Sequence, residues 1–166
     1  MELAGKIIGY CAIVVSLLIY QQKSKKGLLF WKVGSDVLWI SHYLIIGGYT
    51  GAAVSAVALI RSLLFFKRDS SDPKGKVVLL CFLGAAVICT ILTWANAFSL
   101  LAMAGSMMSV FSFWLGKPKV TRILAFPIAL CMLTYGFING STAVVVNETL
   151  IILSSILGII RLDRRK

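Results

Sequence analysis

The stretch "HYLIIGGYTGAAVS" (residues 42–55) recurs in altered form as "TYGFINGSTAVVVN" (residues 134–147), 92 positions further along the chain. Aligning residues 43–62 with residues 135–154 gives seven identities in 20 positions. The identical pairs are Tyr43 and Tyr135, Ile46 and Ile138, Gly48 and Gly140, Thr50 and Thr142, Val54 and Val146, Ile60 and Ile152, and Ser62 and Ser154. This echo predicts a duplicated helical unit around a solute pathway.

The composition places these units in a bilayer. The chain of 166 residues is 59% hydrophobic and 14% charged, which is too apolar for a soluble core of this size. Its hydrophobic runs cover about 3–20, 28–46, 51–66, 77–94, 97–115, 123–138 and 142–161. Each run has roughly 16 to 20 residues, close to the length that crosses a hydrocarbon core about 30 Å thick. The alternation typical of barrel strands is missing, so we expect an all-α protein with seven transmembrane helices.

The basic residues predict the orientation of the chain. The formal net charge is +11, and 14 of the 17 Lys and Arg residues fall in alternate connections or at the C-terminus. They are Lys23, Lys25, Lys26, Lys67, Arg68, Lys74, Lys76, Lys117, Lys119, Arg122, Arg161, Arg164, Arg165 and Lys166. The positive-inside rule then gives an external N-terminus and a cytoplasmic C-terminus. This distribution favours membrane lipid as the partner of the basic face and argues against nucleic acid.

A second match supports the duplication. At an offset of 93, "SLLIYQQKSKK" (residues 16–26) falls on "SVFSFWLGKPK" (residues 109–119). Two units of three helices keep the same orientation only if one more helix lies between them. We therefore expect a first triple-helix repeat at 1–68, a loop and linker helix at 69–96, and a second repeat at 97–166, related by an axis along the membrane normal.

These motifs resemble a known superfamily. The 3+1+3 arrangement is that of the MtN3, SWEET and PQ-loop transporters, and "SLLIYQQKSKKG" (residues 16–27) resembles their PQ-loop, with Tyr20-Gln21 where Pro-Gln would stand. Together with "GSTAVVVNETLIILSSILGIIRLD" (residues 140–163), the chain is most similar to the bacterial inner-membrane family YgjV. The resemblance implies a multi-pass protein of the bacterial inner membrane.

The same resemblance suggests pathway residues. In sugar-transporting members, a tryptophan on the second helix of a triple and an asparagine on the third face the pathway, and Trp39 and Asn147 resemble them. The matching places in the opposite repeats hold Cys131 and Ser55, so a site of this kind would be asymmetric.

Ionisable residues inside the spans point to the same region, because such residues usually face a bundle interior or a water-filled cavity. Asp36 and Arg61 lie roughly 12 and 9 Å from the cytoplasmic ends of their helices and are predicted to pair. Lys32, four residues before Asp36, is the alternative partner, and a purely structural pair is an alternative role. His42 and Glu148 both lie on the order of 20 Å up and form a second, pH-sensitive candidate pair.

Each of these residues also has a structural interpretation. His42 fits a satisfied interfacial histidine as well as a gate or proton sensor, and Asn147 fits an interhelical hydrogen bond. Glu148 suits proton coupling or recognition of a polar substrate. Pro127 lies inside a span, where it is either a hinge or a static kink.

A polar stripe recurs in both third helices, where Ser55 and Ser62 repeat the seven-residue spacing of Asn147 and Ser154. The predicted substrate pathway comprises Trp39, Tyr43, Ser55, Ser62, Tyr135, Asn147, Glu148 and Ser154.

The sequence favours a carrier over an enzyme. It has one His and none of the motifs G-x-S-x-G, H-E-x-x-H or the Walker loop, so we expect no catalytic residues, metal or cofactor. We expect a carrier that moves a small polar solute, by analogy a sugar or sugar-like molecule, through alternating access. A non-transporting receptor or adaptor and a structural membrane protein are the alternatives. A monomer contains both units and suffices, although a homodimer is compatible with this arrangement.

Overall fold

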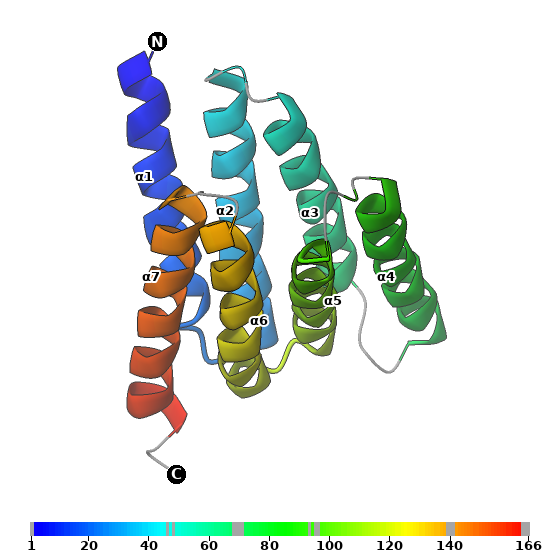
Figure 1. Cartoon of the computed structure of the whole chain (residues 1–166). Helices are drawn as coiled ribbons and strands as arrows, with labels where there is room; N and C mark the ends of the chain where they lie inside the picture. The colour runs from blue at the N-terminus through cyan, green and yellow to red at the C-terminus, as the bar shows by residue number, and fades with distance from the viewer. Residues whose placement is uncertain are drawn as a thin grey trace.

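The computed structural model describes residues 2–45, 47, 49–67, 72–92, 94, 97–138 and 142–163, and these residues form seven α-helices and no strand (Figure 1). The helices are α1 (Glu2–Ile19), α2 (Lys25–Ile45), α3 (Tyr49–Lys67), α4 (Pro73–Leu92), α5 (Ser99–Leu115), α6 (Pro118–Ile138) and α7 (Thr142–Gly158), which a π-helical turn, η1 (Ile159–Asp163), extends. The prediction of an all-α chain with seven helices is confirmed for this part of the chain.

Proline and glycine set several helix ends. Pro73 and Pro118 are the first residues of α4 and α6. The backbone N–H of a first helical residue has no partner within the helix, so a proline at this position removes no hydrogen bond. Helix α5 ends at Leu115 and is capped by Gly116, which has a left-handed φ of 60° and donates its N–H to Ser112 O at 3.2 Å. This sharp end lets α6 begin two residues later.

Length and composition make three helices able to cross a membrane: Pro73–Leu92, Pro118–Ile138 and Val144–Asp163. Helices α1 and α5 are apolar but shorter, and α2 carries Lys32 and Asp36 in its interior. Large apolar side chains lie on the outer faces, including Phe137 and Leu92, which are 80% and 79% exposed. Such faces suit contact with lipid. The crossing of all seven helices stays a prediction.

The helices form two units of three. In the first unit, α2 packs against both α1 and α3; in the second unit, α6 packs against both α5 and α7. Helix α4 packs mainly against α5 at the edge of the molecule (Figure 1). The middle helix in chain order is therefore also the middle helix in space in each unit.

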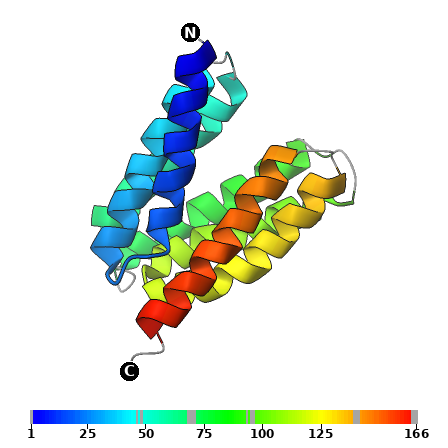
Figure 2. The ribbon, with the colours of Figure 1, turned by 90° about the vertical axis from the view of Figure 1, so that its left-hand side faces the viewer.

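The two units lie against each other at one end and spread apart at the other (Figure 2). The closed end carries the connection between α1 and α2, the connection between α5 and α6, and the C-terminus. The open end carries the N-terminus and the beginnings of α3 and α7. The closest packing between the units is that of α1 with α7 and of α3 with α5.

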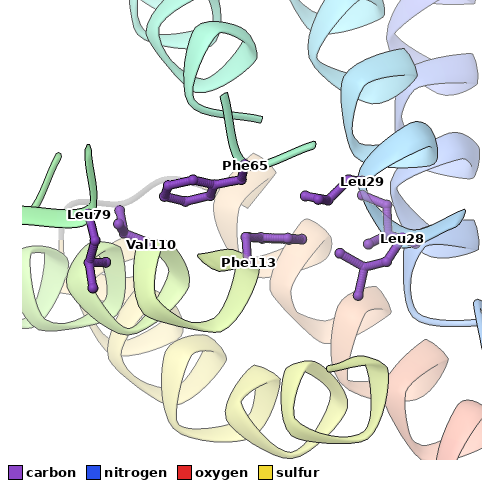
Figure 3. Close-up of a cluster of buried hydrophobic side chains, with 7 residues drawn as sticks. Leu28, Leu29, Phe65, Leu79, Val110 and Phe113 are labelled. Carbon is purple, nitrogen blue, oxygen red and sulfur yellow. The ribbon is translucent and has the colours of Figure 1, made fainter. Parts of the chain in front are cut away.

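A cluster of buried apolar side chains joins the units near the closed end (Figure 3). It consists of Ile19, Leu28, Leu29, Phe65, Leu79, Val110 and Phe113, drawn from α1 through α5. Phe65 also meets Phe82 of α4 edge to face, with ring centroids 6.1 Å apart. Helix α4 is thereby anchored to the same core as both units.

A close approach between α1 and α2 depends on Gly9. A Cβ atom at Gly9 would lie 2.9 Å from two atoms of the His42 ring, whereas a Cβ at Gly84 of α4 would meet nothing within 4 Å. We expect Gly9→Ala to lower the free energy of unfolding by about 1–3 kcal/mol, because the rigid ring must move. Gly84→Ala is the matched control and should be neutral or slightly stabilising. Thermal unfolding in detergent checks this, and equal melting temperatures for the two variants would contradict it.

Candidate functional site

A cleft of about 810 Å³ lies between the two units. Residues from α1, α2, α3, α5, α6 and α7 line it, so both units contribute walls. Its ionisable lining residues are Tyr10, Tyr20, Lys32, His42, Tyr43, Arg61 and Glu148, and its polar lining includes Ser16, Ser35, Ser55, Ser106, Ser109 and Asn147. Of the residues predicted from the sequence, Trp39, Tyr43, Ser55, Asn147 and Glu148 line this cleft together.

A buried ionic network lies at the first unit's side of the cleft. Asp36, which is 3% exposed, accepts an ion-paired hydrogen bond from Lys32 Nζ through Oδ1. Its Oδ2 accepts a hydrogen bond from Ser62 Oγ at 3.0 Å. Both carboxylate oxygens of Asp36 thus accept a hydrogen bond. The ion-pair partner of Asp36 is Lys32, the predicted alternative one helical turn away on α2, and not Arg61. Ser62 serves this network and does not line the cleft.

Arg61 lines the cleft and has no ion pair among the described residues. Its Nε is buried and has no hydrogen-bond partner among the described residues. The guanidinium carbon lies 5.9 Å from the centroid of the Phe113 ring, and Lys32 Nζ lies 5.7 Å from the same centroid. Two cations of the first unit therefore rest on one aromatic ring of the second unit.

An aromatic cluster forms the wall of the cleft on α2. Trp39 stacks on Tyr43 with centroids 5.6 Å apart and meets the His42 ring edge to face at 5.6 Å. His42 Nδ1 lies 2.8 Å from Gly5 O, so an N–H there donates to the α1 backbone. Among the described residues no ion pair joins His42 to Glu148, and the histidine ring bonds to α1 of its own unit.

Glu148 projects from the second unit with one oxygen unoccupied. Its side chain is 9% exposed, and Oε1 accepts a hydrogen bond of 3.2 Å from Asn147 Nδ2. Oε2 is buried and has no hydrogen-bond partner among the described residues. Asn147 and Glu148 together present a polar edge to the cleft, opposite the first unit.

Three other predicted residues lie away from the cleft lining. Ser154 is 6% exposed and packs against α1 at the closed end. Tyr135 is half-buried on α6, and Pro127 lies inside that continuous helix. A hinge at Pro127 stays a prediction.

Arg122 joins the units beneath the cleft. It is 3% exposed, and its Nε and one terminal nitrogen donate to the two oxygens of Asp163 at 2.9 and 2.7 Å. Its other terminal nitrogen donates to Tyr20 O at 3.1 Å and Gln22 O at 2.8 Å. One side chain of α6 thus holds the connection between α1 and α2 and the end of α7.

Gln21 makes a second bridge at the closed end. Its Nε2 donates to Ser154 O at 2.7 Å and to Ser154 Oγ at 3.0 Å, while Ser154 Oγ donates to Leu17 O at 2.7 Å. The close approach needs Gly158, because a Cβ there would lie 2.5 Å from Tyr20 O. These polar bridges and the apolar cluster of Figure 3 close one end of the cleft.

Sequence reasoning missed this bridging role of Arg122 and Asp163. Arg122 counted as one more loop cation, and its partner is 41 residues away with no local spacing to reveal it. For Gln21 a signal existed, because the segment around it resembles a PQ-loop. The terminal residues Arg164, Arg165 and Lys166, counted toward the basic face, lie outside the described residues.

Comparisons with known proteins agree with the membrane character of the chain. Residues 3–166 match the model of the family Imp-YgjV, described as a bacterial inner membrane protein. A search of curated proteins and a search of solved structures each found no match. Because the family model spans nearly the whole sequence, the chain belongs to the Imp-YgjV family of bacterial inner membrane proteins.

Proposed function

We propose that this protein is an inner-membrane carrier that moves a small polar solute by alternating access between its two three-helix units. In this proposal the seven helices cross the membrane in the 3+1+3 order of the MtN3, SWEET and PQ-loop transporters. The open end faces outward, and the basic closed end and the C-terminus face the cytoplasm.

The observation that carries the proposal is the cleft between the units, open at one end and closed at the other. A volume of about 810 Å³ falls within the range of small-molecule sites, about 300–1,000 Å³. Its lining combines an aromatic wall with charged and hydroxyl groups from both units. A solute held there would touch both units, so relative motion of the units would change its access.

The chemistry of the closed end suits reversible opening. The units are joined there by hydrogen bonds of Arg122 and Gln21 to backbone carbonyls and to Ser154. Such groups can exchange protein partners for water when the units separate. The rocking of two rigid units around a fixed site then exposes the cleft on the other side.

Thiol labelling from each side of the membrane tests this proposal without knowledge of the solute. In a variant lacking Cys11, Cys81, Cys89 and Cys131, Ser109→Cys places a thiol in the cleft lining. A membrane-impermeant maleimide should label it from the outer side, and adding Arg122→Gln should increase labelling from the cytoplasmic side. Ser112→Cys, at a position 1% exposed, is the control and should stay unlabelled.

The labelling pattern also separates the carrier from a non-transporting receptor. A receptor of the same fold would keep Ser109→Cys accessible from one side under every condition. Labelling that never changes side, with Arg122→Gln folded, would therefore contradict the carrier and favour the receptor or structural alternative.

A further inference from the structure

Two oppositely charged side chains of the cleft lining have no ion-pair partner among the described residues. Five buried side-chain atoms lack hydrogen-bond partners among the described residues, and the two that belong to charged groups are Arg61 Nε and Glu148 Oε2. Both residues line the cleft, whereas the other three, Ser112, Trp114 and Ser155, do not. The unsatisfied charges are therefore concentrated at the candidate site.

In the neighbouring ionic network of Lys32, Asp36 and Ser62, buried charges do have protein partners. Lys32 and Asp36 neutralise each other, and Ser62 completes the shell of the carboxylate. Leaving a buried donor or acceptor unpaired costs free energy, so such groups in a site usually meet a ligand. Arg61 and Glu148 remain available because neither has a partner of this kind.

The two groups are placed on opposite walls. Arg61 belongs to α3 of the first unit and rests over Phe113, a member of the cluster that seals the closed end. Glu148 belongs to α7 of the second unit and lines the same cleft. A solute spanning the cleft would meet a cation on one unit and an anion on the other.

We infer that the cleft recognises a zwitterionic solute, an amino carboxylic acid whose carboxylate binds Arg61 and whose ammonium group binds Glu148. This inference rests on the proposed function and names its substrate class. The aromatic wall of Trp39 and Tyr43 is available to the carbon skeleton. A simple carboxylate would leave Glu148 unsatisfied, and a neutral sugar would leave both charges without a counter-ion.

The inference predicts coupled closure of the units. A ligand that bridges Arg61 and Glu148 ties the first unit to the second, whereas a ligand with one charge binds to one wall only. Zwitterions should therefore both bind more tightly and favour the state in which the open end has narrowed.

Matched ligands on the purified full-length protein test the inference. We would measure thermal shifts in detergent with the zwitterions glycine, beta-alanine, gamma-aminobutyrate and delta-aminovalerate, together with butyrate, butylamine and glucose. The expected result is stabilisation by zwitterions of a favoured length and little by butyrate or butylamine. Arg61→Gln and Glu148→Gln should each weaken that binding by about tenfold to a hundredfold, because each removes one charge-assisted contact.

Arg161→Gln is the matched control, since it removes the same charge at an exposed position outside the cleft and should leave binding unchanged. Stabilisation by butyrate equal to that by gamma-aminobutyrate would overturn the inference, as would binding that survives both Gln variants. Stabilisation by glucose alone would overturn the zwitterion while leaving the carrier intact. Loss of side-switching in the Ser109→Cys experiment would instead contradict the carrier itself.

Discussion

Replacing Arg122 by Gln is expected to lower the free energy of unfolding by about 3–5 kcal/mol, the usual cost of removing one partner from a buried ion pair. The substitution leaves Asp163 without its guanidinium and frees the carbonyls of Tyr20 and Gln22. The destabilisation should appear as a lower melting temperature in detergent and as partial opening of the closed end. Thermal unfolding and the labelling of Ser109→Cys measure the two effects separately.

The control for this prediction is Arg161→Gln, which removes a positive charge from an exposed position close to the same end of the chain. Equal effects of the two substitutions would show that Arg122 contributes only general charge. A variant with Asp163→Asn should reproduce part of the loss, since the same pair is broken from the other side.

Asp36→Ala is expected to destabilise the first unit by about 3–5 kcal/mol, again because a buried partner is lost. It would leave Lys32 uncompensated next to Arg61, with both cations on the Phe113 ring. The hydroxyl of Ser62 would lose one of its two acceptors and keep the carbonyl of Ala58 at 2.8 Å. Chemical or thermal unfolding of the purified variant measures the effect.

A double variant separates the ion pair from the packing around it. Lys32→Met combined with Asp36→Ala removes both charges and should recover a large part of the stability lost in Asp36→Ala alone, because Lys32 no longer lies buried without its carboxylate. If the loss of stability in the double variant equalled the sum of the losses in Lys32→Met and Asp36→Ala, the two residues would not act as a pair.

The hydrophobic runs predicted the number and order of the helices, but their ends differ for an identifiable reason. Helix α6 begins at Pro118, five residues before the expected start at 123, and α4 begins at Pro73 instead of 77. The first turns of these helices contain basic residues, among them Lys119 and Arg122, which a hydropathy run excludes. Basic residues therefore belong to the helices at the closed end as well as to the connections.

The sequence predicted which residues line the candidate site better than it predicted which residues they contact. Glu148 was recognisable because an ionisable group stands out in an apolar helix, whereas the resemblance to sugar transporters suggested Trp39 and Asn147; all three line the cleft. Depth along a helix does not give direction around its axis. Asp36 therefore pairs with Lys32 on its own helix, and His42 with Gly5 on α1, in place of the partners expected at equal depth.

Alternating access would appear directly in a pair of distances between the two units, measured by double electron–electron resonance. Spin labels at Leu44 and Phe137 would report on the open end, and labels at Lys26 and Lys119 would report on the closed end; all four positions are exposed. If the protein alternates its access, a ligand that stabilises it should shorten the first distance and lengthen the second, and Arg122→Gln should populate the same change. Two distances that stay fixed, or that shorten together, would contradict alternating access.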